Sequence, residues 1–150
     1  MAINPNTDFS SGAVLTAAQQ NRFPRGIMAY TTKTSTFSMT TTMADVGVSA
    51  TFTAVANRYY KYTFFVYAHD ADANSLTVQV TDTSNVSKYQ IRVDSDGPAQ
   101  FGNIILTYIS TESAGSVTRK VRANTSGGGG NLYADATNVM YLLVEDIGPA

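Results

Sequence analysis

The sequence predicts an all-β protein, a single antiparallel β-sandwich of jelly-roll type with an extended N-terminal arm that contains a short helix. Three observations predict it. The chain has 150 residues, of which only 14% are charged, and Thr, Ser and Asn, which favour strands and turns, take the place of charge. About ten short apolar segments alternate with turns, as in sandwiches and jelly rolls. The chain also ends on an apolar run, residues 139–144, that is too short to cross a bilayer.

The N-terminal residues 1–26 differ from the sandwich domain predicted over 27–150. Thr16 and Gln19 have capping-box spacing, so we expect a short helix over about 17–22 that ends before Pro24 and Gly26. One or two helical turns are not stable alone. The arm's apolar side chains therefore need a surface, which is either the chain's own domain or another protein; these are Phe9, Val14, Leu15 and Phe23.

From residue 27 onward the pattern is that of strands. GIMAYTTK and STFSMTTT (26–33 and 35–42) suggest a strand pair at the edge of the fold. SATFTAV (49–55) alternates, with Ala50, Phe52 and Ala54 on one face. RYYKYTFFVYA (58–68) is apolar on both faces, which indicates a position in mid-sheet or at a subunit interface.

Two further segments alternate cleanly and are expected to turn their apolar residues inward. In SLTVQVTD these are Leu76, Val78 and Val80, and in VSKYQIRV they are Tyr89, Ile91 and Val93. Strands are also expected in FGNIILTYIS, VTRKVRAN and NLYAD. In VTRKVRAN, alternation places Lys120 and Arg122 together on one solvated face.

The terminal run is expected to form a strand in the middle of a sheet. Val139, Tyr141 and Leu143 would point to one face, and Met140, Leu142 and Val144 to the other. Glu145 and Asp146 should mark where the strand leaves the interior, with Gly148 and Pro149 ending the pairing. This strand and the arm are the predicted core and interface elements.

No pattern predicts catalysis, a cofactor or a metal site. His69, the single histidine, has no G-x-S-x-G motif to accompany it, so a polar strand end is the simpler reading. Asp70, Asp72 and Asn74 begin with EF-hand spacing, but Ser75 and Thr81 stand where the loop requires Gly and Glu. Ordinary Asp-rich turns explain these residues and Asp94–Asp96, with a loose calcium site as the alternative.

Composition excludes several classes of partner. The net charge is −1 and the pI 5.6, so no sequence-independent binding to nucleic acid is expected. Cysteine is absent, which excludes disulfides and Cys nucleophiles. The polar N-terminal stretch has no apolar core of a secretory signal, and no membrane insertion is expected. The nine tyrosines lie mostly at strand spacing, which favours core and interface packing over a sugar-binding surface.

Four stretches, in this order, resemble a family of small virion structural proteins of tailed phages, often described as minor tail proteins, especially of phages that infect actinobacteria. They are DFSSGAVLTAAQQNRFPRGIMAY, VGVSATFTAVANRYYKYTFFVY, SAGSVTRKVRANTSGGGG and ATNVMYLLVEDIGPA. The resemblance spans almost the whole chain. It implies a multimeric, non-enzymatic β-sandwich on an N-terminal attachment segment, which maps here onto Ala13, Val14, Leu15, Thr16, Ala17, Ala18 and Gln19.

The expected function is therefore a homotrimeric tail or tail-tip component that is assembled in the bacterial cytoplasm and located in the virion. Its partners would be itself and other phage virion proteins. Two alternatives remain open. One is a capsid decoration or head-fibre protein of the same construction, and the other is a module that binds a host surface glycan through exposed tyrosines and loop aspartates.

Overall fold

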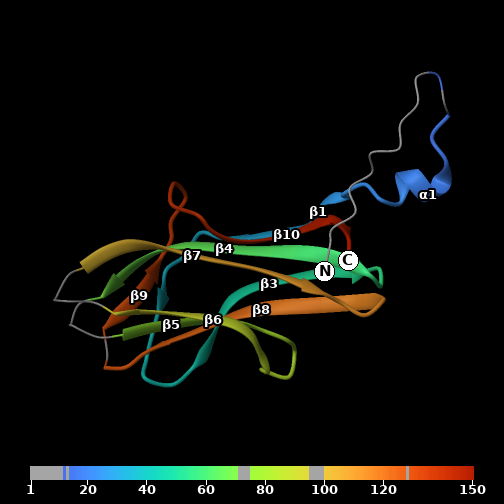
Figure 1. Cartoon of the computed structure of the whole chain (residues 1–150). Coiled ribbons are helices and arrows are strands. Elements are labelled where there is room, and N and C mark those ends of the chain that lie inside the picture. Colours follow the sequence, from blue (N-terminus) through green and yellow to red (C-terminus); the bar gives the residue numbers. More distant parts are fainter. Residues whose placement is uncertain (1–11, 13, 71–74, 95–99, 128) are drawn as a thin grey trace.

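The computed structural model describes residues 12, 14–70, 75–94, 100–127 and 129–150. In these residues ten strands form two antiparallel sheets that lie face to face, while the single short helix stands beyond one end of the sandwich (Figure 1). The predicted all-β class, an antiparallel sandwich of jelly-roll type, is confirmed.

The larger sheet is organised around β4 (Arg58–Asp70), the longest strand. On one side β4 pairs with β7 (Gln100–Thr111) over twelve residues without interruption. Along its other side it pairs first with β10 (Met140–Pro149) and then with β9 (Gly130–Tyr133). Two further strands complete this sheet: β1 (Gly26–Lys33) flanks β10, and β2 (Phe37–Ser38) flanks β9.

The smaller sheet has the order β3 (Ala44–Ala54), β8 (Gly115–Thr125), β5 (Ser75–Thr81) and β6 (Ser87–Asp94). At one side of the sandwich, β1 and β3 lie against each other and close the gap between the sheets. At the other side, the edge strands β6 and β7 approach each other only loosely. The sandwich is therefore closed along one side and open along the other.

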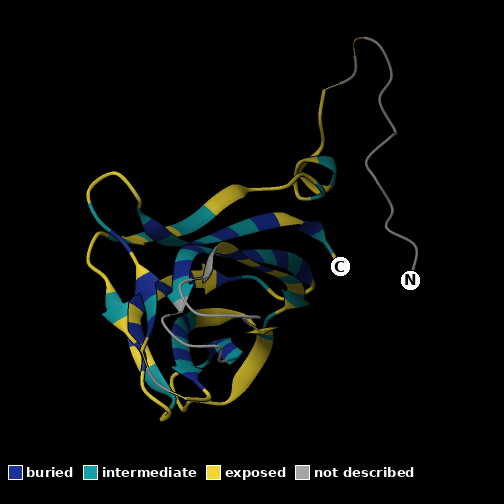
Figure 2. Ribbon diagram, turned by 90° about the vertical axis from the view of Figure 1, so that its left-hand side faces the viewer, coloured by how far each residue is buried: buried dark blue, intermediate teal, exposed yellow. Residues whose placement is uncertain are grey.

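The core lies between the sheets and is built from alternate residues of each strand (Figure 2). From β4 it takes Tyr60, Tyr62, Phe64 and Val66, all fully buried. Phe52 of β3 crosses from the smaller sheet, with its ring centroid 5.0 Å from that of Tyr60. Burying a side chain of this size stabilises the fold by about 1.5–3 kcal/mol. Alternate residues of β3, β4 and β5 supply most of the core.

Three expectations about the strands are wrong. The segments that begin at Gly26 and Ser35 lie on a sheet edge but do not pair with each other. Because β4 is long enough to pair with β10 and β9 in succession, β1 and β2 lie one after the other along that edge.

The second error concerns β6, where Ile91 is half-buried but Tyr89 and Val93 are exposed. Their inward orientation is as expected, and the Tyr89 ring stacks on Tyr108 of β7 at 5.4 Å, but that strand leaves Tyr89 and Val93 partly uncovered. The third error concerns the C-terminus, because Asp146 is buried rather than leaving the interior. The pairing of β10 does end at Gly148 and Pro149, as expected.

Candidate assembly surfaces

The arm contains the predicted helix in a shorter form, α1 (Ala17–Gln20). Thr16 is its N-cap: the Gln19 backbone N–H donates to the Thr16 hydroxyl at 3.2 Å, and the Thr16 N–H donates to the Gln19 side chain at 2.9 Å. This reciprocal capping box satisfies two N–H groups that a helix start leaves open. Ala17 and Ala18 follow as its first helical residues, and none of the helix is buried.

The described apolar side chains of the arm differ in exposure. Val14 is 90% exposed, whereas Leu15 and Phe23 are each 38% exposed. Phe9, the remaining predicted contact residue, lies outside the described residues. Val14 is the most exposed apolar side chain of the described arm.

A buried ion pair holds the base of the arm. Arg58 of β4 donates from Nε and Nη2 to the two carboxylate oxygens of Asp146 on β10, at 2.5 and 2.8 Å. The same guanidinium donates to the backbone carbonyls of Asn21 and Phe23, both at 2.6 Å. The Gly148 N–H donates to Asp146 at 3.0 Å. This cluster fixes the point at which the arm joins the sandwich.

The outward face of the larger sheet carries a continuous apolar surface, here called the sheet-face patch. Register places Tyr141, Phe65 and Ile105 side by side on β10, β4 and β7, with Leu143 and Tyr30 in the adjoining rows. The Tyr141 ring lies 5.5 Å from the Phe65 ring and 5.6 Å from the Tyr30 ring. The patch comprises Ile27, Tyr30, Phe65, Ile105, Tyr141 and Leu143, and Tyr30 is 58% exposed.

The outward face of the smaller sheet is polar in contrast. Asp45 accepts hydrogen bonds from Lys120 at 3.0 Å and from Arg122 at 2.9 Å, which confirms that these two cations share one face. The other outward side chains of this face are Ser49, Thr51, Thr53, Thr77, Gln79, Gln90, Arg92 and Thr118. Since both sheets bury their inner faces, the difference between the outer faces marks the larger sheet as the one suited to a partner.

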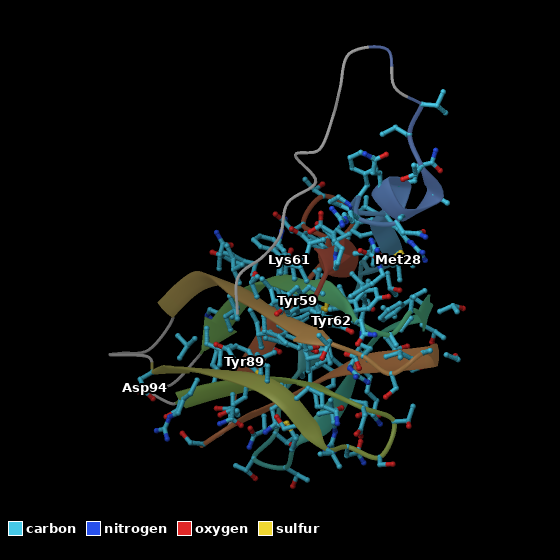
Figure 3. The ribbon with its side chains drawn as sticks, turned by 45° about the vertical axis from the view of Figure 1, so that its right-hand side comes forward. Met28, Tyr59, Lys61, Tyr62, Tyr89 and Asp94 are labelled. Carbon is cyan, nitrogen blue, oxygen red and sulfur yellow. The ribbon has the colours of Figure 1, made fainter. Side chains whose placement is uncertain are left out.

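The open side between β6 and β7 holds a second apolar surface, here called the side patch: Tyr89 and Val93 on β6, with Tyr108 on β7. Ile109 points to the opposite face of β7, where register places it beside Lys61 on the outer side of the larger sheet. Figure 3 labels Tyr89 between these two strands. The Tyr89 and Tyr108 rings stack at 5.4 Å, and Tyr108 stacks on buried Tyr62 at 4.6 Å. A groove of about 540 Å³ runs along this patch.

A charged cluster lines part of the groove. Glu112 is paired with Arg119, and it accepts hydrogen bonds from the hydroxyls of Tyr62 at 2.6 Å and Ser110 at 3.1 Å. Burial raises the pKa of Tyr62, and the bond to Glu112 raises it further; burial likewise raises the pKa of Tyr108. Both phenols stay protonated at neutral pH, so the cluster acts as a fixed hydrogen-bonded support.

The residues considered above for catalysis or metal binding are His69 and the Asp-rich turns. His69, near the end of β4, lines a hollow of about 410 Å³ together with Thr36, Tyr67, Asn131 and Tyr133. Asp72, Asn74 and Asp96 lie outside the described residues. Within the part of the chain that is described, no group of three His, Asp or Glu side chains is placed to hold a metal ion. No helix there is long and apolar enough to span a membrane.

The terminal run behaves as an element with two faces. Met140, Leu142 and Val144 are fully buried in the core, while Tyr141 and Leu143 are half-buried on the sheet-face patch. Val139 lies just before the strand and is half-buried. Sequence reasoning missed the role of Asp146, although it continues the even-numbered alternation of the three core residues and could have been placed inward on that signal.

Comparison with known proteins identifies a fold and not a family. No protein-family model matches the chain, and no curated protein matches significantly. Eiger TNF from S. frugiperda is similar in structure, with a TM-score of 0.56 and 10% identity over 84% of this chain and 96% of that one. A protein of Bacillus endospore appendages, described as disulfide-linked pili, has a TM-score of 0.44 and 8% identity over 94% and 98%. The likeness to Eiger TNF supports the jelly-roll-like sandwich and extends no further than the fold.

Proposed function

We propose that the chain is a non-enzymatic structural component of a phage particle, a homotrimer of the tail or tail tip that attaches through its N-terminal arm. The observation that carries the structural role is the uncovered sheet-face patch, because soluble monomers rarely expose contiguous apolar patches of this kind. The resemblance in sequence to phage virion proteins supports the location.

The arm supports the mode of attachment. Val14 near its tip is 90% exposed, while Arg58 fixes its base by hydrogen bonds to the carbonyls of Asn21 and Phe23. A fixed base with an exposed apolar tip suits insertion into a neighbouring protein. The sandwich, which has its own core, would remain outside the site of attachment.

Deletion of residues 1–20 tests this attachment. The deletion removes Val14, Leu15 and α1 but keeps the two carbonyls that Arg58 binds. We expect a folded protein that no longer joins phage particles, as measured by quantitative mass spectrometry of purified virions. The full-length chain is the control. Normal incorporation of the truncated protein would show that attachment lies elsewhere.

Two alternatives can be separated from this proposal. A capsid decoration or head-fibre protein would be present in far more copies per particle than a tail-tip component, so the same mass spectrometry distinguishes them. A glycan-binding role is favoured by the groove, where the half-exposed Tyr89 ring lies beside Lys88 and Thr107. A glycan array with the parent protein and Tyr89→Ser would detect it.

A further inference from the structure

The two apolar patches lie on different surfaces of the molecule and meet at β7. The sheet-face patch covers the outside of the larger sheet, whereas the side patch fills the open side between the sheets. In the same chain the side formed by β1 and β3 is closed and the other outer face is polar. On the sandwich, exposed apolar side chains are thus concentrated on two adjoining surfaces, and neither surface is covered in the single chain.

The edge strands show the same asymmetry. An uncovered strand edge is normally protected by charge, proline, a bulge or short length. Here β1 and β3 have register irregularities, β2 has two residues, and β6 carries Lys88, Arg92 and Asp94. By contrast, β7 pairs with β4 without interruption, and residues 100–111 contain no charge and no proline. The unprotected edge is the one between the two patches.

Charges near the patches are neutralised within the chain. Lys61 pairs with Glu145 at 2.9 Å beside the sheet-face patch, and Lys88 pairs with Asp82 at 3.0 Å beside the side patch. Figure 3 labels Lys61 at the outer side of the larger sheet. Two identical copies can therefore bring these surfaces together without like-charge repulsion, which makes a second copy of this chain a suitable occupant.

The area is also suitable. Four strands spaced by about 4.8 Å and some nine residues of about 3.3 Å each give the sheet face roughly 600 Å². A stable interface of standard size takes about 800 Å² from each partner. The sheet face of one copy alone supplies most of this area.

The possible contacts between two copies differ in symmetry and in the patches that they cover. A face-to-face dimer would leave the side patch exposed, and a side-to-side dimer would leave the sheet-face patch exposed. Contact between unlike patches is heterologous, and it leaves one patch of each kind free on the outermost copies until a ring closes. A closed ring of this kind covers both surfaces on every copy with a single type of contact.

We propose that the side patch of one copy packs on the sheet-face patch of the next, so that the chain forms a closed ring. The inference rests on the self-association in the proposed function, for which a trimer is the expected ring. It assigns Tyr30 and Tyr141 to one half of the contact and Tyr89 and Val93 to the other.

Light scattering after size exclusion tests the contact on the full chain. We expect the parent to have three times the 16.0 kDa chain mass. Tyr30→Arg blocks the sheet face and Tyr89→Arg blocks the side, so each variant alone should be monomeric. An equal mixture should form dimers, because one unblocked face and one unblocked side remain compatible. Thr53→Arg, on the polar outer face of the smaller sheet, is the matched control and should remain a ring.

Several outcomes would overturn the proposal. Dimers of Tyr89→Arg alone would indicate a face-to-face contact, and dimers of Tyr30→Arg alone a side-to-side contact. A parent that stays monomeric and binds a glycan through Tyr89 would assign the side patch to that ligand. Circular dichroism confirms folding, and Ile105→Lys and Val93→Lys replace either variant that fails to fold.

The ring and the phage function can fail separately. If a ring forms in solution but purified particles lack the protein, the contact between copies stands and the proposed function is wrong. If the protein is monomeric in solution but is found in particles, the proposed function stands and the contact between copies is wrong.

Discussion

At the scale of single residues, Arg58 and Asp146 link the arm to the sandwich. Both side chains are almost fully buried, and each charge is compensated by the other and by further hydrogen bonds. Burying an ion pair is of little net benefit to stability, but removal of one member leaves the other charge without compensation. The pair is therefore best understood as a device that fixes the geometry of the arm.

Asp146→Ala should lower the free energy of unfolding by about 3–5 kcal/mol, because it leaves Arg58 buried and unpaired. Urea denaturation measures this loss. Trypsin should also cut after Arg22 and Arg25 more rapidly, since the base of the arm is released. Asp45→Ala removes an exposed carboxylate that also binds two cations and should cost about 1 kcal/mol or less. Equal effects of the two substitutions would contradict the structural role of Asp146.

At the scale of elements, β10 lies between β1 and β4, and its residues 140–144 are apolar on both faces. One face completes the sandwich core and the other forms the middle of the sheet-face patch. An apolar run of this kind is expected where both faces are covered. In the isolated chain one face is covered and the other is not, so neighbouring residues of this strand should respond differently to the same substitution.

Leu142→Ala and Leu143→Ala form a matched pair that tests this difference. Leu142 is fully buried, and its truncation should cost about 2–5 kcal/mol, a large part of the about 5–15 kcal/mol that stabilises a domain. The melting temperature of the Leu142→Ala variant should therefore fall at every protein concentration. Leu143→Ala should weaken the oligomer and change the melting of the dilute monomer much less. Identical behaviour of the two variants in light scattering and thermal melting would contradict the assignment of faces.

At the scale of the whole molecule, the two outer surfaces of the sandwich have opposite character. The polar face of the smaller sheet is suited to water, whereas the sheet-face patch and the side patch are suited to neighbouring copies. Folding and assembly should then be linked, since a partner that binds only the folded chain stabilises it by mass action.

The melting temperature of the parent should consequently rise with protein concentration, and that of Tyr30→Arg should not. Differential scanning calorimetry over a hundredfold range of concentration measures the dependence. Thr53→Arg should behave like the parent because its outer face takes no part in assembly. A concentration-independent melting temperature for the parent would argue that the sheet-face patch has no second copy as its partner.

The sequence by itself determined the features that depend on local order. Alternation sorted the residues of β3, β4 and β10 onto two faces and turned those of β5 inward, because successive strand residues must point to opposite faces. The Thr16–Gln19 spacing located α1, because a capping box needs only residues three apart. These signals are contained within a few residues, so they do not depend on the rest of the chain.

Only the tertiary structure decided which of the two faces of a strand is covered. Alternation in β6 correctly turned Tyr89 inward, but its exposure depends on whether β7 reaches over it. The partnership of Arg58 with Asp146 joins residues 88 positions apart, and the position of β1 beside β10 likewise depends on where distant strands pair. Coverage and pairing are properties of the assembled sheets, so no local pattern encodes them.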